Sequence, residues 1–248
     1  MGRLSHPMFL CIIGLILMVV APVRAVTDEF IWRDRWNQMG VESKDGYIIG
    51  IYDSVWVLWW DTVKDSLKLD GKTSHLQSDL QTAHSCANGF TTIKSGVEFA
   101  AKTMSRKFDP QTPAASIIYE ALIACDPGFK PARYQQINDF VWKDRWDQYI
   151  NNDSQTGNTN LFSKFFIDGY VAGILDLIRN LDNAAKTQPV LQRDVIDAWG
   201  CGDKISKGKN TTIGHVVNVV DKTIRTDKGP TESMAMAIFD ALRICRLN

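Results

Sequence analysis

The sequence lacks the short motifs that mark the common catalytic classes. It contains no Gly-x-Ser-x-Gly, no His-Glu-x-x-His and no glycine-rich phosphate loop. Two carboxylate pairs remain as candidates for acid–base chemistry, Asp34 with Asp53 and Asp144 with Asp176. Arginine and lysine side chains stand beside both pairs, in patterns that fit solvated helix faces and salt bridges. We therefore expect no catalytic residues, and a binding role is favoured over an enzyme.

The sequence also lacks the residue spacing of a metal or cofactor site. No Cys-x-x-Cys occurs, and the histidines beyond the N-terminal segment show no ligand-like spacing beside the cysteines; they are His75, His84 and His215. We expect neither a metal nor a cofactor.

Net charge is close to zero. The chain has 28 basic and 28 acidic residues, and removal of Arg3 and Arg24 with a leader would leave 26 against 28. No broad basic field exists for nucleic acid or an anionic membrane, so neither is an expected partner.

Long apolar runs are scarce. The run from Met8 to Val20 has 13 residues, against the roughly 20 that a transmembrane helix needs. Val23 and Ala25 follow at the small-residue positions that signal peptidase reads. We expect residues 1–25 to be a cleaved signal peptide rather than a retained anchor. Cys11 would be discarded with it, and 223 residues would be exported.

The sequence has five cysteines, and four of them lie beyond the expected signal peptide. An exported chain would retain Cys86, Cys125, Cys201 and Cys245. An even count in an oxidising compartment indicates disulfides, and four cysteines allow three pairings.

The sequence beyond residue 25 contains an internal repeat. Four blocks of the first half recur in order at offsets of 110, 123, 120 and 120 residues: 30–38 as 140–148, 45–53 as 168–176, 91–93 as 211–213, and 120–125 as 240–245. Blocks that keep their order while the offset changes by a few residues indicate duplication with changes in loop length. Two prolines and a glycine at 126–132 mark the seam. We expect two modules, residues 26–127 (the first copy) and 132–248 (the second copy).

The apolar periodicity of each copy is helical, with no convincing alternating strand. Its stripes fall at i, i+3, i+4 and i+7; they are Ala114, Ile117, Ile118, Ala121, Leu122 and Cys125, then Ile93, Val97, Ala100, Ala101 and Met104, and their counterparts in the second copy. The fold class expected is all-α, with four or five helices in each module.

A Gly-Tyr-x-x-Gly motif occurs once in each copy. Its members are Gly46, Tyr47 and Gly50, then Gly169, Tyr170 and Gly173. Glycine within a helix costs up to about 1 kcal/mol relative to alanine. Close approach of a neighbouring helix, with the tyrosine as a half-buried wedge, is the favoured explanation. A ligand notch is the alternative.

The two copies differ most in their tryptophans. The positions of Trp56, Trp59 and Trp60 in the first copy correspond to a polar stretch around Arg179 and Asp182 in the second. Surplus aromatic surface has to be covered. We expect it either to dock the two modules together, which we favour, or to form part of a partner surface.

The order of these features resembles the Rap/Tai family of type VI secretion immunity proteins, here in a tandem duplicated form. The resemblance rests on an early Gly-Tyr-x-x-Gly helix, a cysteine, a helix opened by threonine and a last helix ending in Ala-Leu-x-x-Cys. It implies Cys86–Cys125 and Cys201–Cys245 disulfides. The proline that commonly follows the first cysteine of the family is replaced by Ala87 and Gly202.

The resemblance also implies a function. Members of the family are periplasmic, act as dimers and bind cell-wall amidases injected by rival bacteria. We therefore expect a periplasmic protein that neutralises or sequesters an amidase effector by protein–protein binding. A general envelope binding or chaperone-like module with the same fold and no toxin target is the alternative.

Overall fold

The computed structural model describes residues 33–66, 75–90, 93–106, 109, 111–125, 161–185, 195, 200, 213–226 and 233–247. Helices are the regular elements of these residues, and the chain is all-α, as the periodicity predicted. The main helices are α2 (Arg33–Trp36), α3 (Val41–Ser66), α4 (His75–Ala87), α5 (Ile93–Met104), α6 (Ala114–Ile123), α8 (Leu161–Ala185), α11 (Ile213–Thr226) and α12 (Met234–Leu247).

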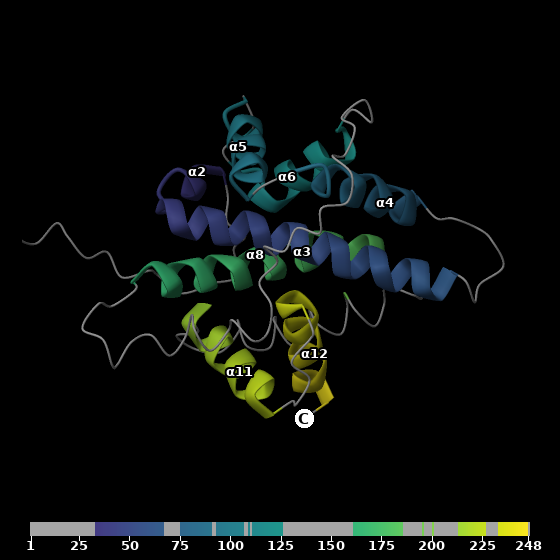
Figure 1. Cartoon of the computed structure of the whole chain (residues 1–248), viewed down its shortest axis with the longest axis vertical. Helices are drawn as coiled ribbons and strands as arrows, with labels where there is room; N and C mark the ends of the chain where they lie inside the picture. Colours follow the sequence, from purple (N-terminus) through teal and green to yellow (C-terminus); the bar gives the residue numbers. More distant parts are fainter. Residues whose placement is uncertain are drawn as a thin grey trace, which may run out of the picture.

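Two long helices, α3 from the first copy and α8 from the second, form the centre of the molecule (Figure 1). They lie side by side and run in the same direction. Helices α4, α5 and α6 cover this pair on one side, and α11 and α12 cover it on the other (Figure 1). The last helix of each copy also reaches across: α6 contacts α8, and α12 contacts α3.

Helix α3 is buried around most of its circumference because other helices pack on both sides of it. Ile48, Ile51, Val55 and Leu58 have no exposed surface. An amphipathic helix with one stripe would leave a polar face, whereas α3 is apolar on several faces, as expected of a central helix. Glu42 in its first turn complements the positive end of the helix dipole.

The stripes predicted for the shorter helices are largely buried. Those of α6, α11 and α12 face the core. In α5 Ala100 and Met104 are buried and Val97 packs partly buried against the core, whereas Ala101 is exposed, contrary to the prediction. The side chain of Ile93 lies outside the described residues. Ala101 lies about 100° around the helix from Ala100, which turns it toward solvent. Ser233 begins α12 by accepting the backbone N–H of Met236 on its hydroxyl, at 3.2 Å.

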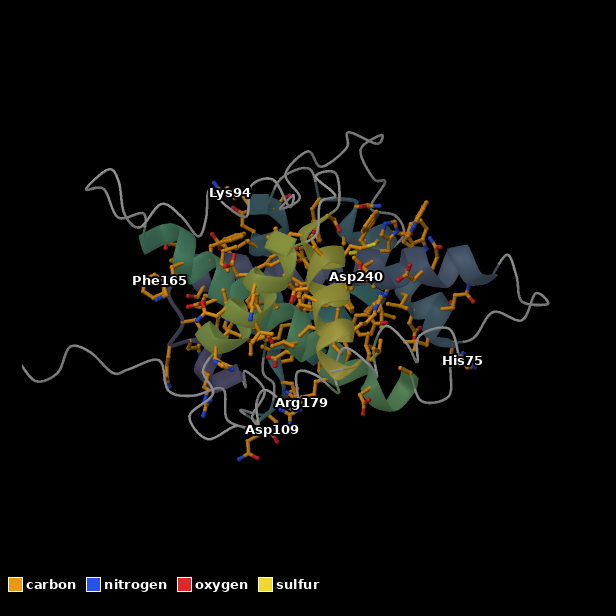
Figure 2. All side chains as sticks on the ribbon, turned by 90° about the horizontal axis from the view of Figure 1, so that it is seen from below. His75, Lys94, Asp109, Phe165, Arg179 and Asp240 are labelled. Carbon is orange, nitrogen blue, oxygen red and sulfur yellow. A yellow bond between two sulfur atoms is a disulfide. The ribbon has the colours of Figure 1, made fainter. Side chains whose placement is uncertain are left out.

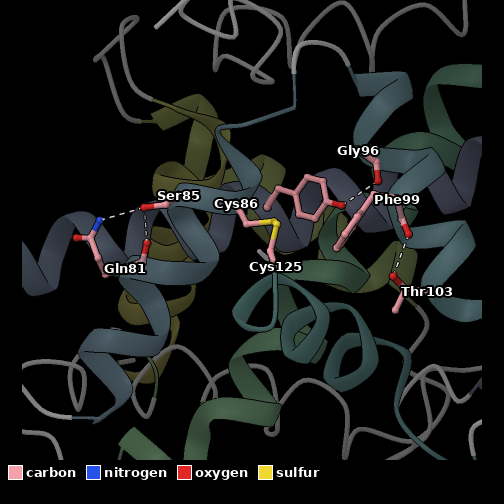
Figure 3. Close-up of a disulfide and its surroundings, with 8 residues drawn as sticks. Gln81, Ser85, Cys86, Gly96, Phe99, Thr103 and Cys125 are labelled. Atoms are coloured by element: carbon pink, nitrogen blue, oxygen red, sulfur yellow. Dashed lines mark hydrogen bonds between the residues drawn. A yellow bond between two sulfur atoms is a disulfide. The ribbon is translucent and has the colours of Figure 1, made fainter. Parts of the chain in front are cut away.

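A disulfide joins Cys86, at the end of α4, to Cys125, just after α6 (Figure 3). It closes a loop over a sequence separation of 39 residues. In the chain-entropy account such a loop contributes about 4 kcal/mol. Cys201 and the side chain of Cys245 lie outside the described residues, as do the expected signal peptide and the seam at 126–132.

Of the helices that the structure describes, none is both long and apolar enough to cross a membrane.

Candidate functional site

The two Gly-Tyr-x-x-Gly motifs meet face to face where α3 crosses α8. A Cβ atom added to Gly46 or Gly50 would overlap the carbonyl oxygens of Phe166 and Tyr170 on α8. The relation is reciprocal, because a Cβ added to Gly169 or Gly173 would overlap the carbonyl oxygens of Ser43 and Tyr47 on α3. Only hydrogen side chains allow backbones to approach this closely. We call this contact the glycine crossing.

Two tyrosine–aspartate hydrogen bonds flank the glycine crossing. The hydroxyl of Tyr47 on α3 donates to Oδ2 of Asp176 on α8, at 2.7 Å. The hydroxyl of Tyr170 on α8 donates to Oδ2 of Asp53 on α3, at 2.6 Å. Each tyrosine is fully buried rather than a half-buried wedge. The seven-residue spacing from the first glycine of each motif to the aspartate puts both on one helix face.

The terminal helices complete this arrangement. The backbone of Ala115, in the first turn of α6, lowers the pKa of Tyr47 against the larger effect of burial. The backbone of Ala235, in the first turn of α12, does the same for Tyr170. Each tyrosine therefore lies between the last helix of its own copy and the long helix of the other copy.

Burial governs the titration of these groups. Asp53 is 1% exposed, and desolvation raises its pKa to about 8, while the hydrogen bond from Tyr170 lowers it. Desolvation and the nearby carboxylates raise the pKa of Tyr47 and Tyr170 well above the usual value. Burial thus favours the neutral form of Asp53, and the carboxyl group is hidden from solvent. The side chains of Asp34 and Asp144, which the sequence analysis paired with Asp53 and Asp176, lie outside the described residues.

A second cluster lies on the other half of α3, toward its C-terminal end. It comprises Trp56, Trp59 and Trp60 with His84 of α4, and we call it the tryptophan cluster. The indoles of Trp56 and Trp60 are nearly parallel with ring centroids 6.2 Å apart, and Trp59 is tilted against Trp60 at 6.3 Å. The rings of Trp59 and His84 stack face to face at 3.8 Å.

Helix α4 fixes Trp59 from two directions. The indole N–H of Trp59 donates to Oε1 of Gln81, at 2.5 Å, and Gln81 in turn donates to the hydroxyl of Ser85 (Figure 3). His84 is 4% exposed, and its Nε2 contacts the side-chain amide of Asn88 at 2.9 Å. Desolvation lowers the pKa of His84 to about 4, so a neutral imidazole stacks on the indole.

The sequence analysis favoured the three tryptophans as the contact between the copies. In the described residues, the glycine face of α3 makes a contact of this kind, and Trp59 stacks on α4 of its own copy. Trp60 is 44% exposed. Within the described part of the chain, the other large exposed apolar side chains are Val41 and Phe165, at the starts of α3 and α8. Figure 2 shows Phe165 at the opposite end of the molecule from His75.

Two features of this region were missed in the sequence. The tyrosine–aspartate bonds could have been inferred from the aspartates that close the repeated block 45–53 and 168–176. The role of His84 could have been inferred from a further repeat, in which Leu76-Gln-Ser-Asp79 returns as Leu191-Gln-Arg-Asp194 at an offset of 115. That offset aligns His84 with Trp199, an aromatic position.

No metal site emerges from this part of the molecule: the described residues contain no group of three or more histidine, cysteine, aspartate or glutamate side chains that could hold an ion. Comparisons with protein-family models, curated proteins and solved structures find no match for the chain.

Proposed function

We propose that this chain is an exported binding protein of immunity type, which neutralises or sequesters a cell-wall amidase by protein–protein binding in the periplasm. Residues 26–127 and 132–248 would be two Rap/Tai-like modules, and Cys201–Cys245 would close the second as Cys86–Cys125 closes the first. Residues 1–25 would be removed on export.

The tryptophan cluster is the observation that carries a binding role. Trp60 leaves 44% of its surface in contact with solvent, although an indole is among the most costly side chains to leave exposed. The rings of Trp56 and Trp59 pack against it, and a side chain already packed against neighbours loses less entropy on association. The second copy has a polar stretch around Arg179 instead, so the three indoles are not common to both copies. The exposed face of Trp60 is available for a partner.

The glycine crossing supports the duplicated form. Its contacts are reciprocal, as in the two-fold interface of a symmetric dimer. A tandem chain would hold within itself the pair that two chains of the family provide together.

The carboxyl groups support binding over catalysis. Asp53 and Asp176, the members of the sequence-based pairs whose contacts are described, both accept tyrosine hydroxyls in the helix crossing. Their role is to join the two long helices.

The test is inhibition of an amidase. The mature chain beginning at Val26 would be mixed with a papain-like peptidoglycan amidase encoded beside its gene, and release of peptide from purified cell wall would be followed. We expect full inhibition near an equimolar ratio and a stable complex on gel filtration. An amidase that stays fully active at a tenfold excess of the protein would contradict the immunity function.

Exposed positions provide the control. Glu98→Gln on α5, where the side chain is 67% exposed, should inhibit as the wild type does. The chaperone-like alternative makes a different prediction, because such a protein would suppress aggregation of unrelated unfolded proteins without forming a defined complex.

A further inference from the structure

The glycine crossing does not by itself decide which copies pair. Each motif meets its counterpart on the other long helix, and each tyrosine bonds the aspartate of the other copy. Two first copies from different chains, or two second copies, carry the same motif and could form the same crossing. A preference for pairing unlike copies, a first with a second, has to come from contacts whose residues differ between the copies. The crosswise contacts of α6 on α8 and of α12 on α3 are of this kind.

A hydrogen bond joins α6 to α8. The hydroxyl of Ser116 donates to Oδ1 of Asn180 at 2.6 Å, and both side chains are half-buried. In the repeat, Ser116 corresponds to Met236, at an offset of 120. Asn180 corresponds to Val57, at an offset of 123. Val57 is fully buried and Met236 packs against the core. A hydrogen-bonded pair on α6 and α8 thus corresponds to two apolar residues on α12 and α3.

An ion pair joins the other two helices, α12 and α3. Arg243 reaches Oδ2 of Asp61 at 3.7 Å, and the two side chains are only 15% and 19% exposed. By the same offsets, Arg243 corresponds to Ile123, which is partly buried against the core. Asp61 corresponds to Ala184. Opposite charges on α12 and α3 thus correspond to apolar residue types on α6 and α8.

Pairing of like copies would break up both contacts. In a pair of first copies, the Ser116 hydroxyl would face Val57 and the Asp61 carboxylate would lose its cation. In a pair of second copies, the Asn180 amide would face an apolar residue and the Arg243 guanidinium would lose Asp61. Two-fold symmetry would produce each mismatch twice. A half-buried polar group that loses its partner costs free energy, and a charged one costs more, so like pairs are less stable than unlike pairs.

We propose that the Ser116–Asn180 bond and the ion pair of α3 with α12 are specificity determinants, which let a first copy pair with a second copy and disfavour its pairing with another first copy. Specificity depends on mismatches against the wrong partner as well as on bonds to the right one. In a tandem chain, like pairing would link separate chains, whereas unlike pairing closes within one chain. The assignment rests on the duplicated form given under the proposed function and is independent of the amidase.

Double-mutant cycles on the intact mature chain measure this selectivity. Ser116→Met places a methionine against Asn180, as in a pair of second copies. Asn180→Val places a valine against Ser116, as in a pair of first copies. The double variant has the residue types that α12 and α3 carry at the corresponding positions. Because each single variant contains one mismatch of the like pairs, the coupling in the cycle measures the free energy that separates unlike from like pairing at this contact.

We expect each single variant to lower the melting temperature by about 2 to 4 °C, the shift for loss of one half-buried hydrogen bond in a chain of this length. The double variant should lie within about 1 °C of the wild type, because methionine and valine again match each other. A second cycle, Asp61→Ala with Arg243→Ile, should show coupling of the same sign. It also keeps the test decisive if Asn180→Val does not fold. Arg243 bonds Asp240 as well, at 3.0 Å, and the cycle cancels the loss of that bond.

The control cycle pairs Asn180→Val with Glu98→Gln, whose side chain is 67% exposed on α5, and its losses should add. Additive losses in both test cycles would overturn the proposal, because like pairs would then be as stable as unlike ones. This result is separable from failure of the proposed function. Additive cycles with an inhibited amidase would refute the specificity determinants and leave the immunity function standing. Coupled cycles with an amidase that stays active would do the reverse.

Discussion

Substitution of Gly50 by alanine tests the glycine crossing most directly. The added Cβ would overlap the carbonyl oxygen of Tyr170 and approach its Cα at 3.2 Å. Both are main-chain atoms, so no rotamer change relieves the overlap and the two long helices have to separate. The separation would also lengthen the bond from the Tyr170 hydroxyl to Asp53.

The magnitude follows from three contributions. Overpacking in a core costs typically 1–3 kcal/mol, and the upper end, about 3 kcal/mol, applies where backbone meets backbone. A weakened buried hydrogen bond adds about 1 kcal/mol. Alanine returns about 1 kcal/mol through its higher helix propensity. We expect Gly50→Ala to lower the free energy of unfolding by about 3 kcal/mol and the melting temperature by about 6 to 12 °C.

Urea and thermal unfolding of the mature chain, followed by circular dichroism, would measure this change. The control is Gly40→Ala, because no atom lies within 4 Å of a Cβ built there. It should cost no more than about 1 kcal/mol, the loss expected when alanine replaces glycine at the position that caps α3. If Gly50→Ala were as stable as the wild type or more so, helix propensity would be the dominant effect, and the close approach of α3 and α8 would be refuted.

Three further predictions concern pH, the disulfide and the tryptophan cluster. Burial raises the pKa of Asp53 to about 8 in the folded state, above its unfolded value near 3.9. Between these two pH values the folded state binds a proton that the unfolded state does not. The contribution of this group to stability is therefore lost as the pH rises through that window, by up to about 1.4 kcal/mol per pH unit. Urea titrations at pH 5 and 7 should show Asp53→Asn gaining on the wild type at the higher pH; a constant difference would refute it. Replacing Cys86 and Cys125 together by serine should lower the urea-derived stability by about 4 kcal/mol, and no loss would contradict the cross-link. Trp59→Ala should cost about 2 to 3 kcal/mol because the indole stacks on His84 and bonds Gln81, and an unchanged melting temperature would contradict that packing.

The sequence predicted the helical class and the buried stripes because both depend on local periodicity. Repetition of the Gly-Tyr-x-x-Gly motif indicated a close helix contact, and the structure shows which helices make it. The crosswise packing of α6 on α8 and α12 on α3 could not be predicted in the same way, because a stripe identifies the buried face of a helix and not the helix that covers it.

Buried polar side chains were harder to predict than apolar ones. Asp53 and His84 are of types that usually lie at the surface, and the sequence analysis placed Asp53 among solvated helix faces. Their burial depends on partners distant in the chain: Asp53 accepts from Tyr170, 117 residues away, and His84 stacks on Trp59 of another helix. Comparing the two copies position by position is the signal that would have identified both.

The division of roles along α3 explains where the two copies can differ. Residues of the glycine crossing are present in both copies because each copy supplies half of every reciprocal contact, and a change on one helix would leave a clash or an unpaired hydroxyl on the other. Trp56, Trp59 and Trp60 lie beyond the crossing, where their counterparts include Arg179 and Asp182. The fold accommodates Trp59 in the first copy because α4 stacks on its indole and accepts its N–H. Packing therefore constrains the counterpart residues less at the end of α3, where Trp60 meets solvent, than at the glycine crossing.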